Sequence, residues 1–311
     1  MLFHRRSDGG PRRARLTAPP GALGIGVLYN PSLPAWLHEH LDLVDYVEVI
    51  PDMFWTDRGP GARPRFVELP SWMAALEWLA VRVPLTLHAT GLSLGSAGVE
   101  DPEYRDHLAD WSRRYAACWL SDHLSFNQVR GAGGRAHHAA LALPVAQDEE
   151  SLEVVAGHVA AARRRLGVPF LVENSATYVD LAEPEMSEAA FLNALVARTG
   201  CGLLLDLHNL HVNTRNRRQD PAAFLDELDL DAVVEIHIAG GSELGGMYTD
   251  SHAGACPPEV WTLLERVARR TPNLRGITFE FHDSYFGVLG AAGLAAELEH
   301  ARALWPWAPR G

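Results

Sequence analysis

Residues 202–209 read GLLLDLHN, a short apolar run that ends among side chains able to bind metal ions. A run of this length between polar residues is typical of a β-strand in the interior of a protein. Asp206 and His208 are two positions apart, so they share one face of a strand. The same arrangement, an apolar run that closes on acids or imidazoles, recurs along the chain, and this repetition decides the fold that we expect.

Eight apolar runs of strand length are present, and a helical pattern follows each of them. The expected strands span residues 22–28, 46–50, 85–89, 119–124, 170–174, 202–207, 232–238 and 276–281. Alternation of strands and helices predicts parallel strands with helices packed around them. Eight repeats in one chain of this length predict an α/β fold, a TIM-type (β/α)8 barrel. A doubly wound open sheet is the alternative, but no glycine-rich phosphate loop follows the first expected strand.

The chain has 311 residues, and nothing in it marks a second domain. Residues 1–20 carry five Arg, two Gly and three Pro, with no periodic apolar pattern. We therefore expect a disordered basic tail over residues 1–20 and a single barrel domain over residues 21–311. The tail lacks the apolar stretch of about 7–15 residues that a secretory signal requires.

The amino-acid composition limits which partners and which cellular compartment we expect for the protein. The net charge is −12, and an acidic surface repels phosphate backbones, so no nucleic-acid partner is expected. No apolar run reaches the roughly 18 residues needed to span a bilayer, so no membrane association is expected either. Three cysteines make no disulfide framework, which favours a reducing, cytoplasmic setting.

Acids and imidazoles lie near the carboxyl end of almost every expected strand, where TIM barrels place their catalytic groups. We take twelve of them as candidate metal ligands, and three of these, Asp206, His237 and Glu280, also as candidate catalytic residues. The twelve are His88, Asp122, His123, Glu173, Asp206, His208, Asn209, His237, Asp250, His252, Glu280 and His282.

Each candidate has an ordinary explanation when it is taken alone. His88 would be a hydrogen-bonded core residue, and Asp250 with His252 a solvated turn. Glu48 and Glu235 lie earlier in their strands, which suggests structural carboxylates deeper in the barrel. Taken together the set is different, because buried acids and imidazoles cost several kcal/mol each unless they are paired or bound to metal.

The chemistry of the candidate ligands limits which metals the site could bind. Imidazole and carboxylate ligands without thiolate suit Fe, Mn, Co or Zn. One ion takes about 4–6 ligands, and the inventory here is larger, so we expect more than one ion. Of the three cysteines only Cys256 lies near the expected mouth, where a buried apolar role is the simpler explanation.

The longest connection runs from residue 125 to residue 147 and contains three glycines with His137 and His138. Connections of this length are uncommon unless they are functional or disordered. A lid or substrate-binding loop and a flexible surface hairpin are both compatible with this stretch.

Around the candidate metal ligands, the sequence resembles the multinuclear non-heme iron-dependent oxidases. This family, once of unknown function, includes the iron oxidase of methanobactin biosynthesis. The resemblance covers roughly residues 24–283. It is carried by LHATGLSLGSAG (87–98), LSDHLS (120–125), LVENSATY (171–178), TGCGLLLDLHNLHVN (199–213), VEIHIAGG (234–241), TDSHAG (249–254) and FEFHD (279–283).

The resemblance implies a TIM-type barrel with two or three iron ions that oxidises a residue, commonly cysteine, of a ribosomally synthesised precursor peptide. Dioxygen is the co-substrate, and a small partner protein often presents the peptide. The family's ligands match His88, Asp122 or His123, Glu173, Asp206, Asn209, His237, Asp250, His252 and Glu280.

The chain also departs from the family pattern. Ile50, Gly241 and Ala253 stand where the broad family usually has a His, a second His and an acid. The methanobactin branch is also apolar at the first of these positions, and Asp52 matches its acid there. His208, His211 and His282 add imidazoles where Asn, a small or aromatic residue, and an acid are common. A site of two irons, or one rebuilt with His208 and His282, is compatible with these changes.

Three functions remain open from the sequence. The first is an iron-dependent, dioxygen-using peptide oxidase. The second is a redox-silent metal enzyme of the sugar-isomerase or endonuclease-IV type; the acidic charge disfavours the DNA enzyme, and the absence of Lys disfavours an isomerase that needs one. The third is a catalytically silent metal-binding scaffold, to which the departures at Ile50, Gly241 and Ala253 point.

Overall fold

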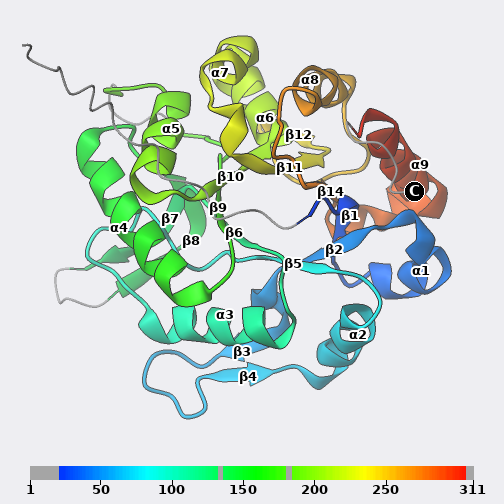
Figure 1. The fold of residues 1–311 in the computed structure, drawn as a ribbon, viewed down its shortest axis with the longest axis horizontal. Helices are drawn as coiled ribbons and strands as arrows, with labels where there is room; N and C mark the ends of the chain where they lie inside the picture. The colour runs from blue at the N-terminus through cyan, green and yellow to red at the C-terminus, as the bar shows by residue number, and fades with distance from the viewer. Residues whose placement is uncertain (1–20, 132–135, 180–183, 306–311) are drawn as a thin grey trace, which may run out of the picture.

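A computed structural model of the chain describes residues 21–131, 136–179 and 184–305. Eight parallel strands close into a barrel in the order β1, β14, β11, β10, β9, β6, β5, β2, which confirms the predicted fold (Figure 1). The expected basic tail, residues 1–20, lies outside the described residues. The barrel strands are β1 (Gly24–Leu28), β2 (Tyr46–Val49), β5 (Leu85–His88), β6 (Leu120–His123), β9 (Phe170–Glu173), β10 (Gly202–Asp206), β11 (Val233–Ala239) and β14 (Gly276–Glu280).

Helices surround the barrel in the described part of the chain (Figure 1). They are α1 (Leu33–His40), α2 (Pro70–Ala80), α3 (Pro102–Arg114), α4 (Glu149–Leu166), α5 (Glu188–Thr199), α6 (Leu207–Arg217), α7 (Pro221–Glu227), α8 (Pro258–Ala268) and α9 (Phe286–Leu304), with the short 3-10 turns η1 (Leu41–Leu43), η2 (Pro51–Phe54), η3 (Leu230–Ala232) and η4 (Asp283–Tyr285). Asp101, Asp148, Ser187 and Asp220 cap α3, α4, α5 and α7, each accepting a hydrogen bond from a backbone N–H of the first turn. None of the described helices combines the length and apolar character that a bilayer crossing demands.

Three two-stranded ribbons lie outside the barrel. They are β3 (Trp55–Asp57) with β4 (Phe66–Glu68), β7 (Ser125–Arg130) with β8 (Ala136–Pro144), and β12 (Ser242–Leu244) with β13 (Met247–Thr249). The long connection after β6 is therefore a hairpin. Its β7 strand is joined to the loop after β5, because Ser93 accepts hydrogen bonds from the backbone of Asn127 and Gln128.

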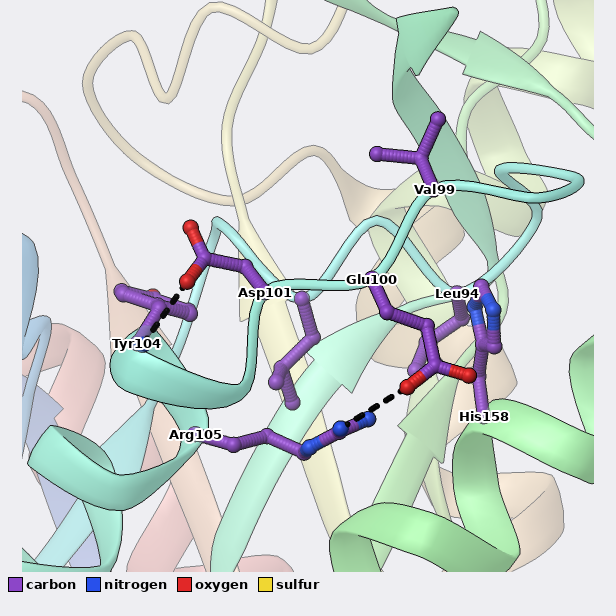
Figure 2. Close-up of a pocket in the computed structure, with 8 residues that line it drawn as sticks. Leu94, Val99, Glu100, Asp101, Tyr104, Arg105 and His158 are labelled. Atoms are coloured by element: carbon purple, nitrogen blue, oxygen red, sulfur yellow. Dashed lines mark hydrogen bonds and ion pairs between the residues drawn. The ribbon is translucent and has the colours of Figure 1, made fainter. Parts of the chain in front are cut away.

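The loop between β5 and α3 is fixed at its far end by charged side chains. Asp101 accepts from the backbone N–H of Tyr104 at 3.0 Å, and Arg105 donates to Glu100 at 3.0 Å (Figure 2). The hollow beside them holds about 10 Å³, which is room for no more than one water. These contacts anchor the loop, and the hollow is too small for an organic ligand.

The amino end of the barrel is filled by one aromatic residue and its neighbours. Tyr46 is fully buried in a cluster with Trp119, Leu171, Leu204 and Val234. Strands β1 and β14 make room for it with glycines, because a Cβ on Gly26 would lie 2.5 Å from Cζ of Tyr46, and one on Gly276 would meet its hydroxyl. The barrel is therefore a packed core below its carboxyl ends, and a site can lie only above this floor.

This packing predicts opposite effects for two Gly→Ala changes. Gly26→Ala should lower the free energy of unfolding by about 1–3 kcal/mol, because the methyl group overpacks against Tyr46. Gly157→Ala is the matched control: Gly157 is exposed in α4 with no atom within 4 Å of an added Cβ, so the change should stabilise by about 0.5–1 kcal/mol. Urea denaturation measures both, and equal effects would contradict the proposed packing of the floor.

Candidate metal centre

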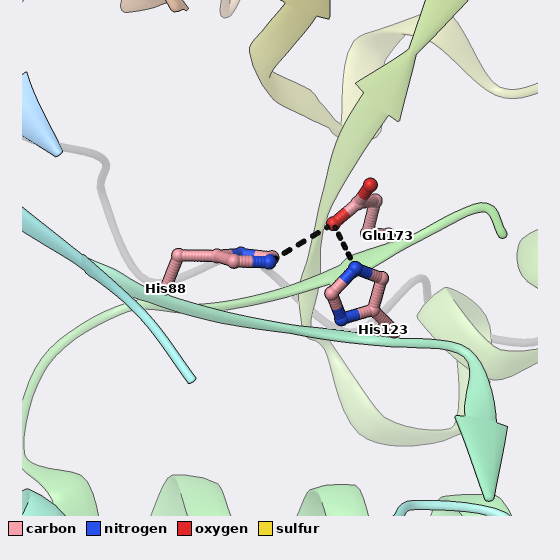
Figure 3. A group of neighbouring side chains, drawn as sticks. All are labelled: His88, His123 and Glu173. Carbon is pink, nitrogen blue, oxygen red and sulfur yellow. Dashed lines mark ion pairs between the residues drawn. The ribbon is translucent and has the colours of Figure 1, made fainter. Parts of the chain in front are cut away.

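Two imidazoles converge on one carboxylate at the carboxyl ends of three neighbouring strands. His88 ends β5, His123 ends β6 and Glu173 ends β9. Nε2 of His88 is 3.5 Å, and Nε2 of His123 3.6 Å, from Oε2 of Glu173 (Figure 3). Ligands bound to one cation at about 2.0–2.2 Å lie roughly 3.0–3.4 Å from each other, so these separations suit a shared ion.

A second group adjoins the first through the same glutamate. Glu173 also lies with Asp206, at the end of β10, and His237, in β11, where one donor atom from each is within 4.8 Å of the others. Nδ1 of His237 is 3.2 Å from Oε1 of Glu280, which ends β14. The two groups share Glu173, an arrangement able to bridge two ions.

The loop after β13 adds a third set of donors at the mouth. Oδ1 of Asp250 is 3.1 Å from Nε2 of His252 and 2.8 Å from Nδ1 of His208. His252 in turn reaches Glu280, with Nε2 3.5 Å from Oε2. The loop donors therefore connect to the strand donors through Glu280.

Several buried oxygen and nitrogen atoms that could bind a metal lack any hydrogen-bond partner among the described residues. They are Oε2 of Glu173, Oδ2 of Asp206, Oδ1 of Asn209, and both ring nitrogens of His237. A buried polar atom without a partner costs about 1–3 kcal/mol, more where it is charged. Cations held by these groups would satisfy the carboxylate and amide oxygens and one ring nitrogen of His237, so the residues present fit a metal centre.

Neighbouring hydrogen bonds hold the donors in place. Asn174 donates to the backbone carbonyl of Asp206 and accepts from its N–H, which ties β9 to β10. Asp206 caps α6 by accepting from the N–H of Asn209, and the Asn209 amide donates to Glu173 at 3.1 Å. The Asn209 amide nitrogen is thus occupied, and its oxygen is left for a cation. The backbone turn from β10 into α6 sets this geometry.

Electrostatics in the site reflect crowding of acids and imidazoles away from water. Burial, and then the charges of Asp250 and Glu280, raise the pKa of Asp206 to about 6. Burial alone would raise the pKa of Glu280, but His237 and His252 lower it to about 2. Burial, followed by the nearby His123 and His237, holds the pKa of His88 well below its usual range, so this imidazole is neutral and able to bind metal.

The structure brings most of the predicted ligands together, with two exceptions. Asp122 is buried, but its carboxylate accepts from the backbone N–H groups of Leu92 and His123. Of this adjacent pair it is therefore His123 that faces Glu173. His282 lines the cavity mouth, but its side chain is 63 % exposed, bonds Ser284 and pairs with Asp283, outside the ligand groups. Its role as a ligand remains a prediction without support from the geometry.

The sequence suggests that Glu48 is a structural carboxylate, but it lies within a group that could hold a metal, with His237 and Glu280. The strand pattern does not indicate this, because the contact with His237 joins β2 to β11, which are not neighbours in the barrel. The other carboxylate expected to lie deep, Glu235, is fully buried and hydrogen-bonded to Tyr46, Trp119 and Thr278. Cys256 is buried and belongs to none of the ligand groups found in the described residues.

A cavity of about 300 Å³ opens above the metal-binding groups. Ligand residues form one part of its lining: His88, His123, Glu173, Asp250, His252 and Glu280. Apolar side chains form another part, and of these only Ile50 stands out in the sequence: Leu28, Tyr29, Ile50, Met53 and Phe281. The described part of the β7–β8 hairpin contributes no lining residue, although Asn127 donates to the carbonyl of Thr90 at the edge of the cavity.

Fold and site together define a TIM barrel with candidate metal-ligand groups at the face where such barrels place their active sites. The chain belongs to the MbnB/TglH/ChrH family of enzymes that modify precursors of ribosomally synthesised and post-translationally modified peptides (RiPPs), since the sequence model of that family matches residues 22–305. This confirms the family resemblance.

Two relatives from bacteria match along most of their length. A UPF0276 protein of Caulobacter vibrioides is 34 % identical over 293 residues, which cover 94 % of this chain and 97 % of the relative. A UPF0276 protein of Chromobacterium violaceum is 38 % identical over 258 residues, covering 82 % and 86 %.

Solved structures share the barrel at low identity. Endonuclease IV from Thermus thermophilus has a TM-score of 0.54 at 22 % identity, covering 90 % of this chain and 98 % of its own. A xylose isomerase-like TIM barrel protein from Mycobacterium smegmatis in complex with magnesium has a TM-score of 0.53 at 14 % identity, covering 91 % and 97 %. At these identities the likeness shows the fold alone.

The geometry predicts different outcomes for three His or Asp substitutions. Asp206→Ala and His237→Ala should each lower bound metal by roughly one ion per chain, because each removes a donor from the buried groups. His282→Ala should keep its metal, since this imidazole is exposed and pairs elsewhere. Elemental analysis of protein loaded anaerobically with ferrous iron measures all three, with circular dichroism to confirm folding. Full metal content in either of the first two variants, or metal loss in the third, would overturn the ligand assignment.

Proposed function

We propose that this protein is a non-heme iron enzyme that uses dioxygen to oxidise a residue, cysteine in the first instance, of a ribosomally synthesised precursor peptide. One observation carries the proposal: Glu173 belongs to two adjoining ligand groups, with His88 and His123 on one side and Asp206 and His237 on the other. Such an arrangement suits two ions side by side. Membership of a RiPP precursor modification family supplies the substrate class.

The donor set is compatible with iron. The three candidate groups contain only imidazoles and carboxylates, a mixed environment that suits Fe, Mn, Co or Zn. We assign one ion to His88, His123 and Glu173, and a second to Glu173, Asp206 and His237, with Glu280 beside it. Bound iron would supply Lewis acidity, which deprotonates a coordinated thiol, and redox chemistry with dioxygen.

The chain's own residues would position the peptide. One wall of the cavity carries the ligands, and Tyr29, Ile50, Met53 and Phe281 form an apolar wall that would hold the substrate away from bulk water. A volume of about 300 Å³ accommodates one or two amino-acid side chains rather than a folded domain. A peptide therefore has to enter as an extended segment.

Partner and compartment follow from charge and cysteine chemistry. A net charge of −12 favours a precursor, or a peptide-presenting partner protein, with a basic recognition segment. The three cysteines are unpaired, as expected in a reducing compartment, and we place the protein in the cytoplasm.

Substitutions at Ile50 test how many iron ions the site holds. It lines the cavity beside His88 and His123, where the broad family has a His. We expect about two irons per chain in the wild type, and Ile50→His should raise this to about three by adding an imidazole donor. Ile50→Ala, which frees the same space without adding a donor, should leave the iron content unchanged. An Ile50→His variant that binds no more iron than Ile50→Ala would contradict our account of this position.

The activity itself predicts peptide-dependent dioxygen consumption. We propose that the electrons that reduce dioxygen come from the peptide, whose thiol is the group oxidised. Iron-loaded protein is mixed anaerobically with a Cys-bearing precursor encoded beside its gene, and with any neighbouring partner protein, before a pulse of oxygen. An oxygen electrode and peptide mass spectrometry should show dioxygen uptake matched to a change in peptide mass, and a Cys→Ser precursor should show neither. An unchanged peptide, together with metal-dependent turnover of a sugar or a phosphodiester without oxygen, would replace the oxidase by a redox-silent enzyme.

A further inference from the structure

Glu48 is a fully buried carboxylate that shares one candidate ligand group with His237 and Glu280. It lies in β2 with none of its surface exposed, and Oε2 is 2.8 Å from Nε2 of His237. Neither of its carboxylate oxygens has a hydrogen-bond partner among the described residues. A buried carboxylate in this state is costly unless a donor or a positive charge faces it. His237 is a donor within reach.

The second carboxylate of this region, Glu235, is in a different state. It accepts hydrogen bonds from the Tyr46 hydroxyl at 2.9 Å, from Nε1 of Trp119 at 2.6 Å and from the Thr278 hydroxyl at 2.7 Å. Its nearest approach to Nε2 of His237 is 3.8 Å. Neutral donors already satisfy Glu235, so Glu48 is the carboxylate that remains available to the imidazole.

The two ring nitrogens of His237 face different surroundings. Nδ1 lies 3.2 Å from Oε1 of Glu280, on the side of the ligand groups, whereas Nε2 faces Glu48 below. A His that binds a metal through one nitrogen usually donates the other N–H to a carboxylate or carbonyl, which fixes the tautomer and the orientation of the ring. The surroundings of His237 match this division of roles.

We infer that Glu48 is a positioning residue for His237: it accepts the Nε2–H and so presents Nδ1 to a metal ion held with Glu173, Asp206 and Glu280. The inference rests on the proposed function only in taking His237 as a metal ligand. At 2.8 Å the two atoms lie at hydrogen-bond separation, and a hydrogen bond between them would satisfy two buried atoms that have no other partner among the described residues. Glu48 itself does not coordinate the ion.

Metal binding tests the inference without any peptide. The metal-free full-length chain is titrated anaerobically with Co²⁺, whose absorption reports coordination, in the wild type and in Glu48→Gln, Glu48→Ala and Glu235→Gln. Glu48→Ala should weaken the site of His237 by about 10- to 100-fold with the same number of ions at saturation. Glu48→Gln keeps a carbonyl acceptor and should weaken it less. Glu235→Gln, the matched buried control, should bind Co²⁺ as the wild type does.

A second measurement separates positioning from a purely structural role. In the proton spectrum of the Co²⁺-loaded protein, the ring N–H of each metal-bound His gives a shifted, exchangeable signal. The His237 signal, assigned by its loss in His237→Ala, should exchange slowly with solvent in the wild type and faster in Glu48→Ala. If Glu48→Gln lacks one bound ion even at saturation, Glu48 is itself a ligand. If Glu48→Ala binds Co²⁺ normally with unchanged exchange, Glu48 is only structural. Either result overturns the inference, and neither depends on whether a peptide is oxidised.

Discussion

The structure depends on one constraint: the carboxyl ends of eight parallel strands meet above a packed floor, and acids and imidazoles are buried there together. Tyr46 and its neighbours fill the barrel below, so the side chains at the ends of β5, β6, β9, β10 and β14 have no lower space to occupy. These side chains also offer one another too few hydrogen-bond donors, because Oε2 of Glu173 and Oδ2 of Asp206 are buried without hydrogen-bond partners in the described structure. Cations would resolve this imbalance, and the shared position of Glu173 would suit more than one.

Much of this could be predicted from the sequence because it is local. Each barrel strand is an apolar run closed by polar residues, and every expected strand overlaps an observed one. Once the strands are known, the TIM-barrel topology sends their carboxyl ends to one face, so the convergence of His88, Glu173, Asp206 and Glu280 follows without knowledge of any distance. The same sequence pattern carried the family resemblance, which the match over residues 22–305 confirms.

What could not be predicted depends on contacts between strands. Glu48 precedes the end of its strand, which suggests a structural carboxylate, and only the 2.8 Å contact with Nε2 of His237 from a strand elsewhere in the barrel places it among the ligands. The adjacent pair Asp122 and His123 was left open, and the loop after β5 decided it by offering the N–H of Leu92 to Asp122. His282 looked equivalent to its neighbours, yet the chain turns into η4 directly after it and leads its side chain to Ser284. Loop geometry of this kind has no signature in a strand pattern.

Endonuclease and isomerase-like barrels share this fold, so the fold does not distinguish an oxidase from a redox-silent enzyme. The identity and the number of the bound metal ions would distinguish them. The most direct test of the central claim is anomalous diffraction at the iron edge from crystals of protein loaded anaerobically with ferrous iron. Our account predicts two iron peaks, one beside His88, His123 and Glu173 and the other beside Asp206 and His237, with Glu173 between them. A single peak, or two peaks that do not share Glu173, would contradict it.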